Sequence, residues 1–139
     1  MASYNGIKYI RNSIYSIIAQ TMRDFELIIT DDCSTDGTGA ILDSISDTRV
    51  RVLRNIENKG VVWSRNRCLA AARGQYIAML DHDDLSRPTR LAKQVAYLDM
   101  NPNTVLVGTA AHTLSNGVMA PTTHPAKTSP VMKIGRAHV

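Results

Sequence analysis

The sequence has few of the residues that build stacking platforms or covalent cross-links. It contains one Phe, one Trp and two Cys among 139 residues. So few large aromatic rings give poor support to the stacking of nucleic-acid bases. Cys33 and Cys68 have neither the spacing of a metal site nor the density of a disulfide-stabilised secreted domain. We therefore expect two reduced thiols in a cytoplasmic protein.

Long hydrophobic runs are also lacking. No apolar run approaches the roughly 18 residues of a membrane span. Residues 1–6 enter directly on a turn and do not resemble a signal peptide. We expect a cytoplasmic protein, and the sequence leaves open a position at the inner face of a membrane.

Charge of one sign is not concentrated anywhere in the chain. The formal net charge is +4, but the basic residues are scattered and form no run. We therefore expect no nucleic-acid partner. Gly37 and Gly39 supply neither a Walker nor a dinucleotide-binding phosphate loop, which argues against a kinase, an ATPase or a nicotinamide enzyme.

Hydrophobic periodicity alternates along the chain between helical and strand-like segments. The alternation predicts an α/β fold with a mostly parallel sheet and helices on both faces. A doubly wound sheet ordinarily begins with a strand, whereas this chain begins with a helix, so the first strand is missing. We expect helices at about 7–22, around 41–45, and at about 61–72 and 88–101, strands at 25–30, 50–53, 76–80 and 104–114, and a hairpin turn at 115–117.

The apolar run at 76–80 ends in Asp81, His82, Asp83 and Asp84. Three carboxylates within four residues repel one another and resist desolvation, so they need a cation. Mg²⁺ and Mn²⁺ prefer such oxygen ligands, commonly alongside substrate phosphates. The cluster therefore predicts a metal-assisted reaction on a phosphorylated substrate. We expect Asp84 to orient Asp83 or to cap the following turn, and His82 to point away from both acids as a bystander.

A second acidic pair, Asp31 and Asp32, follows the strand expected at 25–30. Paired acids after a strand also hold Mg²⁺ in phosphoacceptor receiver domains. A receiver needs a phosphorylatable Asp after a later strand and a Lys after another, and no suitable Lys follows 104–114. The receiver interpretation is therefore disfavoured, and we expect Asp31 to cap a turn or to pack.

The end of the chain has no periodicity from residue 121 onward. Residues 133–139 can be encoded by AAGATCGGAAGAGCACACGTC, which contains the start of a widely used sequencing-library adapter. Our hypothesis is that these residues are translated adapter. Without Lys133 and Arg136, the net charge of +4 becomes +2.

A series of short motifs stands in a fixed order along the chain: Ser3-Tyr4-Asn5-Gly6, residues 24–38, Asn58-Lys59-Gly60, Ser64-Arg65-Asn66, residues 72–77, Leu80-Asp81-His82-Asp83-Asp84, residues 88–91 and Val107-Gly108-Thr109. In this order they resemble the family 2 glycosyltransferases over roughly residues 1–120. Any one motif alone is weak, but the collinear set is specific.

The resemblance implies a GT-A fold that uses a nucleotide-diphosphate sugar, with a UDP-linked donor expected, together with Mn²⁺ or Mg²⁺. By position, Ser3 and Tyr4 match the end of the first strand, which touches the nucleotide. Asp81 and Asp83 match the two acids of the family's D-x-D motif. Asp83 is then the metal ligand, while Asp81 lies toward the ribose and diphosphate.

Two further residues acquire roles from the resemblance. Asp32 matches the aspartate that reads the base, typically the uracil N–H, and turn capping is the alternative. Arg65 begins a helix near the expected nucleotide pocket and could clamp the diphosphate, or could be an ordinary surface residue. We expect Trp63 to lie in the core and not to form a sugar platform.

The chain also departs from the family pattern. The first strand is reduced to a stub, and Cys33 stands where Gly or Asn is commoner. The family's catalytic base, an acidic residue of the acceptor-binding half, is expected beyond residue 139, so no catalytic residue is assigned. We expect residues 1–120 to be the donor-binding half, 121–132 the irregular start of the acceptor half, and 133–139 the adapter-derived tail.

The expected activity is transfer of a sugar from a nucleotide-diphosphate sugar to a hydroxyl acceptor, with inversion and metal dependence. The acceptor would be a saccharide or a lipid-linked one, in cell-surface polysaccharide or glycolipid synthesis, and the full-length protein could associate peripherally with a membrane. Two alternatives are a sugar-nucleotide nucleotidylyltransferase and a non-catalytic nucleotide-binding fragment. The first should carry a Gly-rich phosphate loop after its first strand, which Ser3-Tyr4-Asn5-Gly6 does not resemble.

Overall fold

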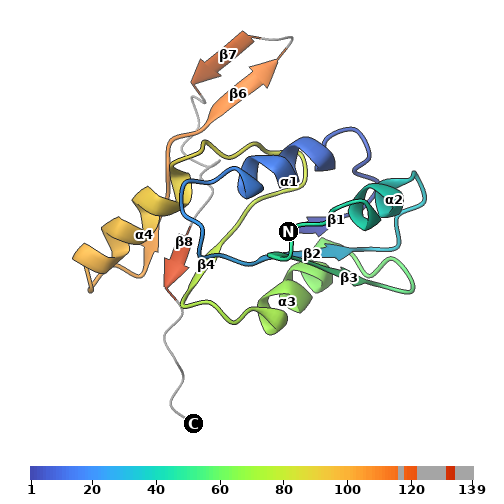
Figure 1. Cartoon of the computed structure of the whole chain (residues 1–139), viewed down its shortest axis with the longest axis horizontal. Coiled ribbons are helices and arrows are strands. Elements are labelled where there is room, and N and C mark those ends of the chain that lie inside the picture. Colours follow the sequence, from blue (N-terminus) through green and yellow to red (C-terminus); the bar gives the residue numbers. More distant parts are fainter. Residues whose placement is uncertain (116–117, 122–130, 134–139) are drawn as a thin grey trace.

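The computed structural model describes residues 1–115, 118–121 and 131–133 of the chain. Helices and strands alternate through most of these residues (Figure 1). None of the described helices is long and apolar enough to cross a membrane. In chain order the elements are β1 (Ala2–Ser3), α1 (Ile10–Ile18), β2 (Leu27–Asp31), α2 (Thr38–Asp43), β3 (Val50–Arg54), α3 (Val61–Ala71), β4 (Tyr76–Ala78), α4 (Arg90–Met100), β5 (Leu106–Val107), β6 (His112–Ser115), β7 (Val118–Pro121) and β8 (Val131–Lys133).

A parallel sheet with the strand order β1-β2-β3 lies between three of the helices. Ala2 pairs with Thr30 and Leu27 with Val50, and both strand pairs are parallel. Helices α1 and α2 lie on one side of this sheet and α3 lies on the other (Figure 1). The predicted α/β fold with helices on both faces is confirmed. The first strand is not missing altogether: it is present as β1, a strand of only 2 residues, in agreement with the stub that the family resemblance implied.

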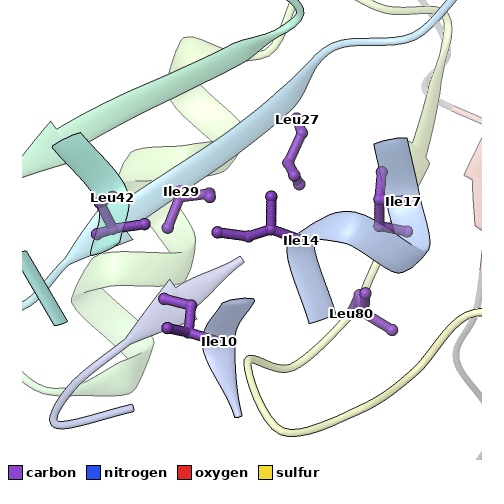
Figure 2. Packing of buried hydrophobic residues seen from close by; sticks show 7 residues of the cluster. All are labelled: Ile10, Ile14, Ile17, Leu27, Ile29, Leu42 and Leu80. Carbon is purple, nitrogen blue, oxygen red and sulfur yellow. The ribbon is translucent and has the colours of Figure 1, made fainter. Parts of the chain in front are cut away.

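One face of β2 packs against an apolar stripe of α1. The stripe follows the helical spacing of Ile10, Ile14 and Ile17, which are all buried. Burial of one such side chain stabilises the fold by about 1.5–3 kcal/mol. Because Leu80 belongs to the same cluster, the core fixes the chain directly before the acidic residues. The members of the cluster are Ile10, Ile14, Ile17, Leu27, Ile29, Leu42 and Leu80 (Figure 2).

The opposite face of β2 is covered by α3. Thr30 Oγ1 lies 3.1 Å from Cys68 Sγ, and the Cys68 thiol donates to the carbonyl oxygen of Met1 at 3.2 Å. All residues of β2 are consequently buried. Burial on both faces is the usual environment of an inner parallel strand.

The chain after β4 forms two further sheets. β8 pairs antiparallel with both β4 and β5. β6 and β7 form an antiparallel hairpin with Ser115 opposite Val118, which confirms the predicted hairpin, although residues 116–117 lie outside the described part of the chain. The single strand expected at 104–114 is instead two short strands, β5 and β6. Gly108 lies between them, and glycine weakens a strand interior.

β8 lies in a segment that we expected to be irregular. Val131 and Met132 pair with β4 and β5 and satisfy backbone groups at the edges of both strands. A strand of 3 residues is too short for its periodicity to be visible in the sequence. Of the proposed adapter-derived residues, Lys133 ends β8 and 134–139 lie outside the described residues.

Candidate functional site

The loops that follow β1 and β2 are joined by hydrogen bonds. Asn5 N–H donates to Ser34 Oγ at 3.0 Å, and Gly6 N–H donates to Thr38 Oγ1 at 2.9 Å. Thr35 N–H donates in turn to Asn5 Oδ1 at 2.9 Å. The bonds hold together the carboxyl ends of two neighbouring parallel strands, and this edge is where α/β sheets bind ligands.

Ser3 and Tyr4, the residues expected to touch a nucleotide, lie at this edge. Ser3 is 2% exposed, and its Oγ is buried without a hydrogen-bond partner in the described part of the chain. A buried polar group without a partner costs about 1–3 kcal/mol. Tyr4 is exposed. The edge therefore presents the accessible ring of Tyr4 to a ligand, whereas the Ser3 hydroxyl is buried beneath it.

Residues 81–84 form a turn, called the acidic turn below, which approaches the end of β1. The turn is closed by Asp84 N–H, which donates to the carbonyl oxygen of Asp81 at 3.2 Å. A Cβ added to Gly6 would lie 2.7 Å from His82 Cδ2 and 2.9 Å from Ser3 Oγ, so a larger residue would not fit. We expected His82 to point away from both acids; the chain turns at His82 and Asp83, and the turn places the imidazole against Gly6.

Arg65 and Asp81 are brought together by α3 and the acidic turn. Arg65 Nη2 lies 2.5 Å from Asp81 Oδ1, and both side chains are partly exposed. An exposed pair of this kind contributes at most about 1 kcal/mol of stability. Arg65 Nε is buried and has no hydrogen-bond partner within the described residues. Of the two roles left open for Arg65, the contact favours a part in the site.

Asp83 lies at the exposed side of the acidic turn. Within the described ranges, no group of three or more His, Cys, Asp or Glu side chains is arranged to hold a metal ion. An ion at Asp83 would therefore need oxygen ligands from phosphate or water, which is how proteins commonly hold Mg²⁺. With phosphate or water oxygens as the remaining ligands, the carboxylates of the turn fit Mn²⁺ or Mg²⁺.

Asp32 has a different environment from Asp83. Its side chain is buried and accepts hydrogen bonds from Lys59 N–H at 2.9 Å, Gly60 N–H at 2.8 Å and Asn55 Nδ2 at 2.6 Å. Burial acts to raise the pKa of Asp32, but these hydrogen bonds outweigh it and lower the pKa below its ordinary value. Its carboxylate fixes the loop that leads into α3, whereas contact with a base stays a prediction.

Asp31 packs and caps, as expected. Its side chain is 5% exposed and lies 3.2 Å from Arg54 Nη1, and it accepts a hydrogen bond from Ser34 N–H at 3.2 Å. Neither of these contacts of the Asp31 carboxylate involves a residue of the acidic turn. The pair Asp31 and Asp32 therefore organises the loops after β2 and β3.

Cys33 adopts a left-handed backbone conformation with φ of 62°. Glycine and asparagine tolerate this region best, because other side chains crowd the following carbonyl. The preference of the family pattern for Gly or Asn at this position thus has a backbone cause. The Cys33 thiol is free and half-buried.

Three polar residues of α1 and its C-terminal extension were missed by the sequence reasoning. Ser13 Oγ donates to the carbonyl oxygen of Asp81 at 3.1 Å, and Ser16 Oγ accepts from Ser86 N–H at 3.0 Å. Gln20 is fully buried; its Nε2 donates to the carbonyl oxygen of Arg87 at 2.8 Å. The signal was their spacing of three and four residues beside the apolar stripe, which places them on one face of the helix.

Arg90, the first residue of α4, was also missed as a contributor to the site. It is 7% exposed, and its Nη2 donates to the carbonyl oxygen of Met79 at 2.8 Å. Burial lowers the pKa of Arg90, and the charge of Asp84 opposes this change. A buried cation therefore faces the acidic turn from its inner side.

A separate hollow of about 560 Å³ lies along the outer side of α3. Trp63 lines it and is 57% exposed, so the expectation of a core Trp63 is wrong. The reason is helical geometry. Ser64 and Cys68 are the buried residues of α3, and Trp63, one position before Ser64, lies about 100° away around the helix and is exposed. The acidic turn contributes no residue to the hollow, whose lining residues are Arg54, Asn55, Ile56, Lys59, Trp63, Asn66, Arg67 and Ala70.

The sequence matches the family model described as Glycosyl transferase family 2 over residues 1–136. It is similar to the putative glycosyltransferase EpsE of Bacillus subtilis (strain 168), with 43% identity over 112 residues that cover 78% of this chain and 40% of that protein. It is also similar to the UDP-Glc:alpha-D-GlcNAc-diphosphoundecaprenol beta-1,3-glucosyltransferase WfaP of Escherichia coli, with 37% identity over 99 residues, 71% of this chain and 39% of that protein. The chain spans about two-fifths of the length of both relatives.

Solved structures with the same fold carry nucleotide sugars. S. aureus TarS 1–349 in complex with UDP-GlcNAc has a TM-score of 0.71 and 28% identity over 76% of this chain and 31% of that chain. The mannosyltransferase PcManGT from Pyrobaculum calidifontis, in complex with GDP-Man and Mn²⁺, has a TM-score of 0.67 and 27% identity over 76% of this chain and 32% of that chain. The likeness covers about three-quarters of the chain in both cases.

Proposed function

The chain belongs to glycosyl transferase family 2 and has the GT-A type of fold, and on this premise we propose that it is the donor-binding part of an enzyme that transfers a sugar from a UDP-linked donor to a hydroxyl acceptor. The acceptor is a saccharide or a lipid-linked saccharide of a cell-surface polysaccharide or glycolipid. The relative WfaP, whose name gives UDP-Glc as donor and a diphosphoundecaprenol-linked GlcNAc as acceptor, supports this choice.

One observation carries the proposal: a partly exposed guanidinium lies beside accessible carboxylates at the carboxyl edge of the sheet. Arg65 Nη2 lies 2.5 Å from Asp81 Oδ1, and both side chains are partly exposed. Tyr4 and Asp83 are exposed as well. Phosphate oxygens of a ligand accept hydrogen bonds from a guanidinium of this kind, and this edge is the expected place for a ligand.

Each residue of the site has a proposed role. Ser3 and Tyr4 contact the nucleoside, and Asp32 supports the nucleoside pocket by fixing the loop that leads into α3. Arg65 presents further N–H groups to the diphosphate beyond the one that contacts Asp81. Direct recognition of the base by Asp32 stays a prediction, since its oxygens already accept three protein hydrogen bonds.

Asp83 would hold Mn²⁺ or Mg²⁺ together with diphosphate oxygens of the donor, while Asp81 faces the ribose and diphosphate. A metal in this position supplies Lewis-acid stabilisation of the charge that develops on the departing nucleoside diphosphate. Arg65 adds a second positive charge on the same side of the turn. The chain thus orients the donor and neutralises its leaving group.

Transfer with inversion requires a base that takes the proton of the acceptor hydroxyl. The residue for this step is proposed to lie outside the chain described, among the acceptor-binding residues. The proposed location of the enzyme is the cytoplasm, with its acceptor at the inner face of a membrane.

The test is release of UDP from UDP-glucose and UDP-GlcNAc by the full-length protein, with Mn²⁺ and a lipid-linked GlcNAc acceptor. We expect UDP release that requires the acceptor and stops when EDTA is added. Metal-dependent UDP binding without turnover of either donor would favour the non-catalytic alternative or another sugar. No UDP binding by the folded protein would contradict the proposal.

A further inference from the structure

Polar side chains of neighbouring segments form hydrogen bonds with the main chain in and around the acidic turn. Leu80, directly before the turn, is buried in the apolar cluster. The carbonyl oxygen of Asp81 accepts from Ser13 Oγ at 3.1 Å and from Asp84 N–H at 3.2 Å. The main chain of the turn is therefore fixed at its start and closed on itself, whereas the side chain of Asp83 is exposed.

Behind the turn, Gln20 fastens the segment that leads to α4. Gln20 Nε2 donates to the carbonyl oxygen of Arg87 at 2.8 Å and to Ser86 Oγ at 3.2 Å, and its Oε1 accepts from Leu91 N–H at 3.1 Å. The last of these bonds satisfies one of the free N–H groups in the first turn of α4. The position of Arg90 next to Leu91 is thus determined by contacts with Gln20, two residues after the end of α1.

Arg90 connects this framework to the strand before the acidic turn. Its Nη2 donates to the carbonyl oxygen of Met79 at 2.8 Å, and its Nε donates to Gln94 Oε1 at 3.0 Å. Gln94 Nε2 donates in turn to the carbonyl oxygen of Val107 at 3.2 Å. A planar guanidinium can satisfy two such acceptors at once, whereas an ammonium has no comparable fork.

We propose that Arg90 is a positioning residue for the metal site: it holds the acidic turn in the conformation that receives the ion, through its hydrogen bond to the carbonyl oxygen of Met79 directly before Leu80 and the turn. The inference rests on the proposed function and concerns the same site. Because the turn is ordered before the ligand arrives, binding does not have to supply the free energy of ordering it.

Electrostatics and positioning give opposite expectations for the loss of Arg90. A positive charge beside the acidic turn repels a divalent cation, so its removal would by charge alone strengthen metal binding. Removal of a residue that positions metal ligands weakens binding, typically by 10- to 100-fold. The direction of the change therefore distinguishes the two effects.

The experiment is calorimetric titration of UDP into the full-length protein at graded Mn²⁺ concentrations, which gives the Mn²⁺ concentration for half-maximal UDP binding. The variants are Arg90→Met, Arg90→Lys and the control Arg87→Met. Arg87 is an exposed basic residue of the same segment, and its replacement removes the same charge without the buried contacts. A partly unfolded population lowers the number of sites but leaves the half-saturating Mn²⁺ concentration of the folded molecules unchanged.

We expect Arg90→Met to raise the half-saturating Mn²⁺ concentration by about 10-fold or more. Arg90→Lys keeps the charge but loses the pair of hydrogen bonds that the planar guanidinium makes, so it should raise the Mn²⁺ concentration in the same direction by a smaller factor. If Arg90→Met does not fold, the result with Arg90→Lys tests the inference. Arg87→Met should match the wild type. An unchanged or lower concentration in the Arg90 variants overturns the inference. Absence of Mn²⁺-dependent UDP binding in the wild type would instead overturn the proposed function on which it rests.

Discussion

Two acidic segments follow strands of this protein, and the same type of side chain behaves differently in each. After β2, Asp31 and Asp32 are 3% and 2% exposed and accept hydrogen bonds from within the protein. After β4, the side chain of Asp81 is 50% exposed and Asp83 is also exposed. The first segment uses its carboxylates to fix loops, and the second presents them to the solvent.

The difference originates in what surrounds each strand end. The loop after β3 returns across the end of β2 and offers the N–H groups of Lys59 and Gly60 to Asp32. Around the acidic turn, Ser13 and Arg90 engage main-chain carbonyl oxygens and leave the carboxylate of Asp83 accessible. The comparison shows that a strand-end carboxylate stays accessible where the neighbouring donors bind the main chain, as around Asp83, although Arg65 reaches the side chain of Asp81.

The largest effect should come from removal of the buried carboxylate. Asp32→Ala leaves Lys59 N–H without its acceptor, while Gly60 N–H keeps Asn58 Oδ1 at 3.1 Å and Asn55 Nδ2 keeps Ser64 Oγ at 3.0 Å. We expect a loss of about 2 kcal/mol in the free energy of unfolding, since an unsatisfied polar group costs about 1–3 kcal/mol. Urea denaturation followed by circular dichroism measures it. Asp83→Ala is the matched control and should change the free energy of unfolding by less than about 0.5 kcal/mol. Equal losses of stability in the two variants would contradict the claim that only the first segment uses its carboxylates to fix loops.

A smaller effect is expected on binding when Arg65 is replaced. Arg65→Met removes the partner of Asp81 and the proposed diphosphate contact. We expect UDP affinity to fall about 10-fold, which is about 1.4 kcal/mol, with little change in stability because the pair is partly exposed. Arg73→Met is the control, since Arg73 lies beyond the other end of α3 and contacts Glu26. The two variants binding UDP equally would exclude Arg65 from the site.

The backbone at Cys33 gives a still smaller effect of opposite sign. Cys33→Gly relieves the left-handed conformation at φ 62° but adds freedom to the unfolded chain. We expect a net gain of roughly 0.5–1 kcal/mol in the free energy of unfolding, because the left-handed conformation costs about 1–2 kcal/mol in a residue with a Cβ. Thermal denaturation of both proteins tests the sign, and a lower melting temperature for Cys33→Gly would show that the thiol contributes more than the backbone costs.

The smallest effect concerns an acid outside both segments. Hydrogen bonds from the side chain and backbone of Arg49 lower the pKa of Asp47 from 3.8 to about 2. A carboxyl group with a lower pKa in the folded state stabilises that state above its ordinary pKa, and this contribution is lost as the pH falls from about 4 to about 2. The stability difference between wild type and Asp47→Asn should therefore shrink across this window in urea denaturation curves, whereas a difference independent of pH would contradict the assignment.

The sequence predicted those features that depend on local patterns. Hydrophobic periodicity at about 7–22 identified α1, and the strand expected at 25–30 identified β2 within one or two residues. The position of Asp83 after a strand was also local information. These features were accessible because helices and strands impose fixed periods on the residues that they bury.

Features that depend on contacts between distant segments were not predicted. The donors to Asp32 lie 23, 27 and 28 residues away along the chain, and Gln20 reaches Leu91 across 71 residues. Residues 88–91 entered the prediction only as one of the family motifs, and nothing local showed that Arg90 is buried and donates to the carbonyl oxygen of Met79. Local propensity carries no information on which loop closes over a given strand end, so these roles needed the three-dimensional structure.

The most direct measurement of the central claim is UDP binding by calorimetry, with and without Mn²⁺, to the wild type, Asp83→Ala and the control Asp24→Ala. Asp24 is an exposed acid that precedes β2, at the opposite edge of the parallel sheet. The account predicts Mn²⁺-dependent binding in the wild type and Asp24→Ala and its loss in Asp83→Ala, with all three proteins folded. Equal Mn²⁺-dependent binding by Asp83→Ala would contradict the claim that the acidic turn after β4 is the metal site.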